Sequence, residues 1–433
     1  MAHCVGIRRE DKSVSERRVP ITPDDVRVLK EQGVDIVVQP SNIRVFSEKE
    51  YIAAGATVSE DLSQCPVVFA LKEIPSTFFR EGGAYLFFSH TIKGQPHNMP
   101  MLKRMMELGC DLIDYERVVD AANRRLVFFG WHAGVAGMIE SLVALGKRLR
   151  SEHVKSPFEA IKRPVEYTSI HEAKIALEVV GRWIESEGLP NEVLPLTVGI
   201  TGYGNVSQGA QEMLDILPTT EVSPAELRTV TAGTAGAKHT IFKTVFKEED
   251  MVVAKLSGVP FVLQDYYDHP EKYDGIFETY LPHLSVLVNC IFWTPRYPKL
   301  VTKGYLRNRW KNTRLKVIGD ISCDVDGSVE ATVKATDPAS PVFVWDPYTD
   351  VAIDGWEGNG PVIMAVDILP SELPRDASVY FSNVLKEFIP AVVRADFDVD
   401  FEHLALPEPI KKAVILHRGK LTPDYEYMAK FLG

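Results

Sequence analysis

The chain has 433 residues, of which 45% are hydrophobic and 25% are charged, and this balance indicates a globular protein of two or three domains. Its net charge of -11 argues against nucleic acid or an anionic membrane as partner, so we expect small-molecule substrates, while the oligomeric state stays open. The five cysteines are widely spaced without a C-x-x-C pair, which argues against a disulfide framework and a zinc site. Together with a polar N-terminus unlike a signal peptide, they predict a cytoplasmic location.

Helix and strand patterns alternate in the first part of the chain. Thr22 and Pro23 begin a helix that Gly33 ends, and Ser47 with Glu50 forms the capping box of a second helix. This alternation predicts a parallel α/β domain. The expected strands cover residues 34–39, 67–71, 85–88 and 111–114, and a Met-rich helix covers residues 99–108.

The middle of the chain begins with helices. The apolar stretch 126–148 carries His132 and Glu140, so it predicts a buried helix and not a membrane span. Ser169 and Glu172 form the capping box of another helix. Further along, we expect a loop over residues 231–236 and strands over 286–289, 316–318 and 342–345.

The stretch LTVGITGYGNVSQG, residues 196–209, has the pattern of a strand, a tight turn and a helix that opens a dinucleotide-binding fold. Gly202 permits the turn, Gly204 permits close approach of a pyrophosphate, and Gly209 is expected to let the helix lie close on the strand. Asn205 and Val206 begin the helix, whose free N–H groups favour phosphate. A glycine turn of some other α/β unit is the alternative.

Two further positions bear on a cofactor. About 20 residues beyond the first glycine, where such folds usually carry an acid for the ribose, the sequence has Glu221 and Ser223. Glu221 would suit a 2′-hydroxyl and Ser223 would tolerate a 2′-phosphate, so the choice between NADP and NAD stays open, with NADP slightly favoured. Asp320 ends an apolar strand and either faces the nicotinamide or caps a helix.

Lys72 and His90 each come directly after a predicted strand. Ligands of parallel sheets lie beyond the carboxyl ends of the strands, so these two side chains form a candidate acid/base pair. Arg18 and Arg125 are candidate carboxylate binders, and Glu116 is a third strand-end group. Structural roles, such as surface ion pairs for the arginines, are the alternative for each residue alone. No histidine has metal-ligand spacing, so we predict no metal.

Several stretches together closely resemble the lysine-ketoglutarate reductase family, whose lysine-forming saccharopine dehydrogenase activity also occurs as one half of aminoadipic semialdehyde synthase. They are IRREDKSVSERRVPITP, FFSHTIKGQ, FFGWHAGVAGM, TGYGNVSQGAQ, DISCDVDGSVE and VDILPSELPRDAS. The resemblance implies a two-lobe architecture like that of alanine dehydrogenase, with a cleft between the lobes. A central dinucleotide-binding Rossmann domain, residues 131–324, would be inserted into a split α/β substrate domain, residues 1–130 and 325–433.

The resemblance also implies a reaction. The family joins L-lysine to 2-oxoglutarate as an imine and reduces it to saccharopine with a nicotinamide cofactor. Lys72 and His90 match the family's acid/base pair, and Asp320 matches a position near the nicotinamide. Other active-site positions are matched by Glu73, Glu116, Arg18 and Arg125.

One feature departs from the family pattern, because the Trp-His pair in FGWHAG replaces residues common in close relatives. Alternatives therefore remain. They are an alanine-dehydrogenase-like enzyme or another opine-type reductase acting on a different amine or 2-oxo acid, and a non-catalytic nucleotide-binding subunit.

Overall fold

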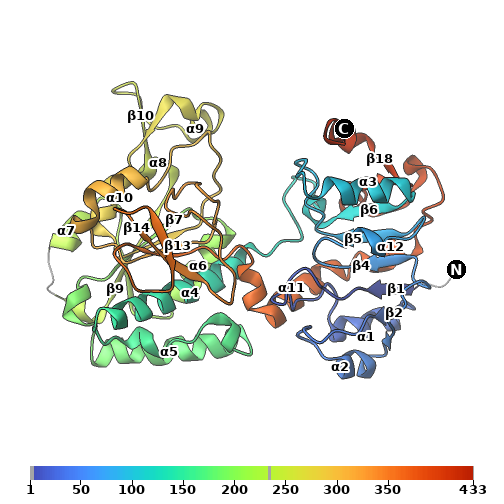
Figure 1. Cartoon of the computed structure of the whole chain (residues 1–433), viewed down its shortest axis with the longest axis horizontal. Helices are drawn as coiled ribbons and strands as arrows, with labels where there is room; N and C mark the ends of the chain where they lie inside the picture. Colours follow the sequence, from blue (N-terminus) through green and yellow to red (C-terminus); the bar gives the residue numbers. More distant parts are fainter. Residues whose placement is uncertain (1–3, 233–235, 433) are drawn as a thin grey trace. The chain divides into compact units, whose positions relative to one another are not determined.

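The computed structural model describes residues 4–232 and 236–432. The chain divides into two compact units, the first made of Met1–Phe129 and Pro374–Gly433 and the second of Gly130–Leu373. Figure 1 shows the blue N-terminal and red C-terminal segments together in the first unit, with the middle of the chain in the second. The second unit is therefore an insertion within the first.

The position where the chain returns to the first unit differs from the prediction. Residues 325–373 were expected in the split domain, but they pack within the second unit, and the return begins at Pro374. The reason is strand pairing, because three strands between residues 342 and 364 extend the second sheet. Local sequence patterns do not reveal such long-range pairing.

The first unit is built on one eight-stranded sheet of order β18-β17-β6-β5-β4-β1-β2-β3. Strands β3, β2, β1, β4, β5 and β6 run parallel, whereas β17 pairs antiparallel with β6 and β18 pairs antiparallel with β17. The central strand β1 had not been predicted, because CVGI is a short apolar run at the start of the chain. The strands are β1 (Cys4–Ile7), β2 (Asp35–Val38), β3 (Thr57–Val58), β4 (Val67–Phe69), β5 (Ala84–Phe87), β6 (Asp111–Asp114), β17 (Val414–His417) and β18 (Lys420–Leu421).

Helices cover this sheet. The predicted caps are confirmed: the Thr22 hydroxyl accepts a hydrogen bond from the amide of Asp25, and Ser47 and Glu50 form a capping box. Buried side chains from the sheet and from both chain segments form the core, which joins Val5 and Phe69 to Phe381 and Val392. The helices are α1 (Pro23–Glu31), α2 (Glu48–Ala53), α3 (Met99–Glu107), α11 (Pro374–Leu385), α12 (Ile389–Arg394) and α13 (Glu408–Lys411).

The second unit has its own eight-stranded sheet, of order β15-β14-β16-β13-β12-β7-β9-β8. From β16 to β8 the strands run parallel, and β14 and β15 add an antiparallel edge. The strands are β7 (Thr197–Thr201), β8 (Thr219–Glu221), β9 (Ile241–Phe246), β12 (Val286–Asn289), β13 (Val317–Asp320), β14 (Val342–Asp346), β15 (Val351–Asp354) and β16 (Val362–Met364), with a separate pair β10 (Val252–Ala254) and β11 (Tyr273–Gly275).

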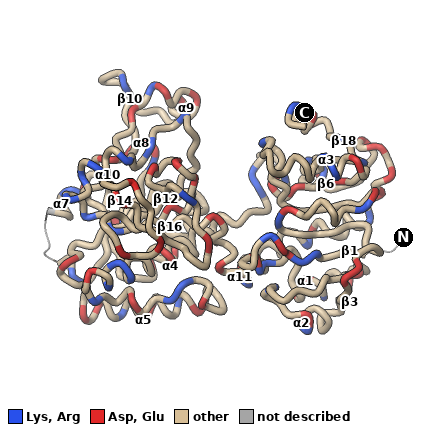
Figure 2. Tube along the Cα trace, in the orientation of Figure 1, with Lys and Arg blue, Asp and Glu red and all other residues tan. Residues whose placement is uncertain are grey.

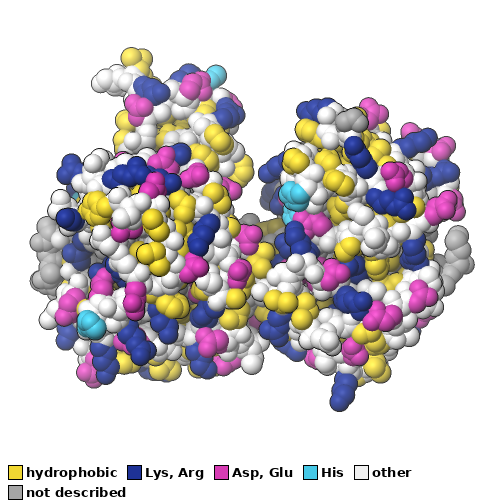
Figure 3. All heavy atoms as spheres, in the orientation of Figure 1, with side chains coloured by type: hydrophobic (Ala, Val, Ile, Leu, Met, Phe, Trp, Pro, Cys, Tyr) yellow, Lys and Arg dark blue, Asp and Glu magenta, His cyan; other side chains and the backbone are white. Residues whose placement is uncertain are grey.

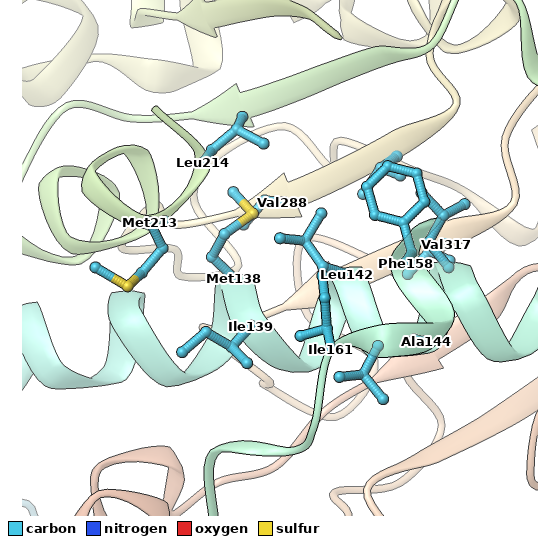
Figure 4. Close-up of a cluster of buried hydrophobic side chains, with 14 of the residues drawn as sticks. Met138, Ile139, Leu142, Ala144, Phe158, Ile161, Met213, Leu214, Val288 and Val317 are labelled. Atoms are coloured by element: carbon cyan, nitrogen blue, oxygen red, sulfur yellow. The ribbon is translucent and has the colours of Figure 1, made fainter. Parts of the chain in front are cut away.

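The long helix α4 (Gly130–Ser151) is buried along most of its length against this sheet. Figure 4 shows Met138 and Leu142 rising from α4 toward the strand that carries Val288. It begins at Gly130, and just before it Leu126 donates its amide to the carbonyl oxygen of Val118 in a hairpin. The other helices are α5 (Ile170–Ser186), α6 (Asn205–Leu214), α7 (Leu227–Ala232), α8 (Glu248–Met251), α9 (Leu263–Asp268) and α10 (Lys303–Arg309).

The loop expected over residues 231–236 overlaps the end of α7, and its residues 233–235 lie outside the described residues. Within the described ranges, the search for helices long and apolar enough to cross a membrane finds none. Basic and acidic residues are interspersed along the traces of both units in Figure 2, and the face visible in Figure 3 likewise carries both signs.

Candidate active site and nucleotide-binding turn

The candidate catalytic residues lie at the carboxyl edge of the first sheet, the edge where β1, β4, β5 and β6 end. These four strands are parallel neighbours, so the residues that follow them come to the same edge. Lys72 follows β4, His90 follows β5 and Glu116 follows β6. The charged loop after β1 joins them there, which the sequence did not reveal because β1 itself was missed.

His90 and Glu73 form a hydrogen-bonded pair at this edge. His90 Nδ1 lies 2.8 Å from Glu73 Oε1, and Lys12 Nζ donates to Glu73 Oε2 at 2.6 Å. Burial raises the pKa of Glu73, but the hydrogen bonds from His90 and Lys12 outweigh it and hold that pKa well below its ordinary value. Glu73 therefore stays ionised, and its hydrogen bond to Nδ1 orients the imidazole.

The backbone and one ring contact hold His90 in place. Its φ of 48° is unusual for a residue other than glycine, and Asn98 Nδ2 donates to its carbonyl oxygen at 3.1 Å. The ring stacks on Phe88, with centroids 6.2 Å apart. A left-handed residue fixed by its surroundings is common at functional sites.

Lys72 is largely buried beside this pair. Burial lowers the pKa of its ammonium, the positive charge of Arg18 lowers it further, and the carboxylates of Glu16 and Glu73 oppose the shift. Among the described residues, neither a hydrogen bond nor an ion pair of its Nζ is recorded. A lysine with a lowered pKa and an uncommitted amine is suited to proton transfer.

The two candidate carboxylate binders are already paired with carboxylates. Arg18 donates Nε to Glu16 at 2.8 Å and Nη2 at 2.5 Å, both side chains are buried, and the guanidinium lies 4.4 Å from the Phe129 ring centroid. Arg125 Nη2 donates to Glu116 at 2.5 Å, and its side chain is about half exposed. The structure thus unites Glu116 and Arg125, and a substrate carboxylate would compete with Glu116 for that arginine.

The glycine turn of the second unit lies at the carboxyl end of β7. Gly202 has φ of +83°, which a side chain would disfavour, and Gly204 is the N-cap of α6 without a capping side chain. A Cβ at Gly204 would meet no atom within 4 Å. Asn205 and Val206 begin α6, so its first amides stay open to a ligand.

Gly209 serves a different contact from the one predicted. A Cβ there would lie 2.1 Å from the carbonyl oxygen of Trp131 and 3.1 Å from the amide of Val135, both on α4. The prediction that Gly209 packs α6 on the strand is therefore wrong. A Cβ at Gly134 of α4 would likewise lie 1.9 Å from the carbonyl oxygen of Val206 on α6. The two glycines therefore let the backbones of α4 and α6 come close together.

Asp320 ends β13, and its carboxyl oxygens accept hydrogen bonds from uncharged side chains. Its Oδ1 accepts from Asn289 Nδ2 at 2.8 Å, its Oδ2 accepts from the Thr332 hydroxyl at 2.6 Å, and Asn289 Oδ1 accepts from Thr201 at 2.9 Å. Burial raises the pKa of Asp320 to about 6. These contacts tie the ends of β7, β12 and β13 together and occupy both oxygens of Asp320.

Ser223 lies away from the glycine turn. It follows β8, and its hydroxyl donates to Glu226 at 2.6 Å. The neighbour of β7 is β9, not β8, and β9 is followed by Lys247 and Glu248. Glu248, at the end of the strand that pairs with β7, is therefore a candidate for the ribose-binding acid of a dinucleotide fold.

The surroundings of Glu248 agree with this placement. Its Oε1 accepts from the Tyr267 hydroxyl at 2.7 Å. The charge of Glu248 raises the pKa of Tyr203, which lies in the glycine turn. The sequence did not reveal this candidate, because distance along the chain from the turn does not show which strand lies beside β7.

The fold and these strand-end residues define a two-unit α/β protein of the alanine dehydrogenase type. The alanine dehydrogenase/PNT N-terminal domain matches residues 6–136. The structure of an L-alanine dehydrogenase aligns with a TM-score of 0.63 at 17% identity, covering 99% of this chain and 100% of that one. This likeness confirms the predicted fold class.

Two proteins are similar in sequence over most of this chain. The chain is 36% identical over 444 residues to an alpha-aminoadipic semialdehyde synthase of Arabidopsis thaliana, covering 98% of this chain but 41% of the relative. It is 26% identical to an NAD(+)-dependent, L-lysine-forming saccharopine dehydrogenase of Yarrowia lipolytica, covering 88% of this chain and 89% of that protein. The chain thus spans less than half of the first relative. It is a homologue of both, and the predicted relationship is confirmed.

Proposed function

We propose that the protein is a nicotinamide-dependent reductase that joins L-lysine to 2-oxoglutarate and forms saccharopine. One observation carries the proposal: Lys72, Glu73 and His90 meet at one sheet edge with the burial and charge that proton transfer needs. The names of the relatives support the same reaction, because one is a lysine-forming saccharopine dehydrogenase.

The chemistry needs proton transfer at several steps. The lysine side-chain amine adds to the 2-oxo carbon, water leaves to give an imine, and the imine is reduced to a secondary amine. When bound, the reduced nicotinamide supplies the hydride for that reduction. His90, oriented by the ionised Glu73, exchanges protons with the hydroxyl that leaves and with the product amine, and Lys72 assists.

Arg18 and Arg125 are proposed to bind substrate carboxylates. Arg125 would exchange Glu116 for the substrate, because its exposed side chain needs only one new hydrogen-bond partner. Arg18 would act with its Glu16 pair intact, as a cation whose position the buried carboxylate fixes.

The second unit is proposed to hold the cofactor. The pyrophosphate would lie on Gly202, Gly204 and the first amides of α6, at Asn205 and Val206. Asp320 would shape the neighbouring strand end without using its oxygens on the ligand. No metal is required.

Glu248 takes over the role predicted for Ser223 and changes the cofactor preference. A carboxylate accepts both hydroxyls of an adenosine ribose and repels a 2′-phosphate, so we propose NAD over NADP. Glu248→Ser should shift the kcat/KM ratio for NADH against NADPH toward NADPH by roughly 10- to 100-fold. Glu249→Ser is the matched control, since this neighbouring acid is exposed. An unchanged ratio in Glu248→Ser would remove Glu248 from the ribose site.

The proposed function is tested by the absorbance of reduced nicotinamide in purified protein with lysine and 2-oxoglutarate. Oxidation that needs both substrates is the expected result. Oxidation of the reduced cofactor with ammonia in place of lysine would instead favour an alanine-dehydrogenase-like reaction. The structural neighbour is the reason to test that candidate. Binding of cofactor without oxidation on any amine and oxo acid would indicate a non-catalytic subunit. The five free cysteines support a reducing compartment such as the cytoplasm.

A further inference from the structure

Glu10 contacts the backbone of the candidate catalytic lysine. This buried carboxylate lies in the loop after β1, and it accepts the amide of Leu71 through Oε1 at 2.7 Å and the amide of Lys72 through Oε2 at 3.0 Å. Both oxygens are thus used on two consecutive amides at the end of β4.

The contact replaces a missing part of the sheet. The last backbone bond between β1 and β4 joins the amide of Arg8 to the carbonyl of Phe69, at 2.9 Å, after which the chain leaves the strand. The amide of Ala70 still donates to Leu86 of β5, but without Glu10 the amides of Leu71 and Lys72 would lack an acceptor, which is costly for buried backbone. The Glu10 side chain supplies the acceptors that the strand no longer provides.

We infer that Glu10 is a positioning residue that fixes the backbone of Lys72, and thereby the depth at which the lysine amine is buried. The inference rests on the proposed function only for the catalytic role of Lys72. Because burial is the main cause of the lowered pKa of Lys72, releasing its backbone should let the ammonium reach water and raise that pKa.

The charges around Glu10 come from several elements. Burial and the neighbouring carboxylate of Glu16 raise the pKa of Glu10 to about 7, while the two amides and Arg8 oppose the shift. The charge of Glu10 also opposes the lowering of the Arg44 pKa by burial and adds to the raised pKa of the Tyr115 hydroxyl. A neutral side chain of the same shape tests the positioning, because it keeps the volume and loses one acceptor.

The test compares Glu10→Gln with Asp111→Asn. Asp111 is also a buried carboxylate of the first unit, paired with His417 at 2.7 Å, but it begins β6 and so lies at the opposite edge of the sheet. Two quantities are measured in each protein: turnover with its pH profile, and the midpoint pH of Lys72 acetylation by trace acetic anhydride, followed by peptide mass spectrometry. Acetylation reports the lysine without any need for activity.

Glu10→Gln should lower turnover by about 10- to 100-fold with the cofactor KM unchanged, and should move the Lys72 midpoint to higher pH. Asp111→Asn should change neither, even if it melts at a lower temperature. A wild-type midpoint in Glu10→Gln, or an equal shift in Asp111→Asn, would overturn the inference. If Glu10→Gln does not fold, Glu10→Asp, whose shorter side chain cannot reach both amides, gives the same two readings. If the wild-type protein oxidises no cofactor, the proposed function fails, while the midpoint still decides whether Glu10 holds Lys72.

Discussion

The carboxyl edges of the two sheets are built from different side chains. At the edge of the first sheet lie the titratable side chains of Lys72, Glu73 and His90: burial lowers the pKa of Lys72, and hydrogen bonds from His90 and Lys12 lower the pKa of Glu73. At the edge of the second, Asn289 and Asp320 are locked in hydrogen bonds, and the open surface is the backbone of a glycine turn. Both edges belong to parallel sheets and present strand ends to a ligand.

The difference fits the two tasks that we propose for the two edges. Proton transfer needs groups whose charge can change, and such groups must be buried next to one another to be tuned. Phosphate binding needs amides that do not move, and a satisfied polar network keeps the strand ends rigid. Substitutions at the first edge should therefore change turnover, whereas those at the second should change binding or stability.

The largest effect is expected at His90. His90→Ala removes the proposed proton carrier, so turnover should fall by about 100- to 10,000-fold while the dissociation constant of the cofactor stays near that of the wild type. Steady-state kinetics and a fluorescence titration of reduced cofactor measure the two. His97→Ala, which changes an exposed histidine in the same segment, is the control and should retain activity. Full turnover in His90→Ala would separate this residue from the chemistry.

Gly209 within α6 and Gly204 at its N-cap should respond differently to substitution by alanine. In Gly209→Ala the new methyl would lie 2.1 Å from the carbonyl oxygen of Trp131, so we expect a loss of about 1–3 kcal/mol in the free energy of unfolding. In Gly204→Ala the methyl enters open space, so stability should be kept and the cofactor KM should rise. Urea denaturation and cofactor kinetics on both variants check this. Equal stability losses would contradict the helix-contact role of Gly209.

The smallest effect concerns pH and Asp320. Burial raises the pKa of Asp320 from 3.8 to about 6, so the native state binds its proton more tightly than the unfolded state does. Its contribution to stability is complete below pH 4 and is lost as the pH rises through 6. Asp320→Asn cannot titrate, so its unfolding free energy should gain on the wild type by on the order of 1–2 kcal/mol across that range. A difference independent of pH in denaturation curves would speak against the shift.

The features that depend on local sequence pattern could be predicted. Lys72 and His90 follow apolar strands, and the turn around Gly202 has its own signature, so their places at strand ends could be predicted. Their roles stay predictions. The structure added what distant segments decide: strand order places β9, which Glu248 follows, beside β7, and helix packing gave Gly209 its partner on α4.

Short elements and side-chain pairing account for the remainder. Four residues formed β1, too few for a periodic pattern, and without it Glu10 had no predicted position. The engagement of Arg18 by Glu16 and of Arg125 by Glu116 is a matter of side-chain geometry that spacing does not specify.

The most direct test of the central claim follows the hydride itself. Reduced cofactor carrying deuterium at both hydrogen positions of nicotinamide C4 is incubated with the protein, lysine and 2-oxoglutarate, and the products are analysed by mass spectrometry. We predict saccharopine that carries the deuterium, formed only when both substrates are present and in much smaller amount with His90→Ala. No deuterium in any product of lysine and 2-oxoglutarate, with deuterium in glutamate only when ammonia replaces lysine, would contradict this prediction.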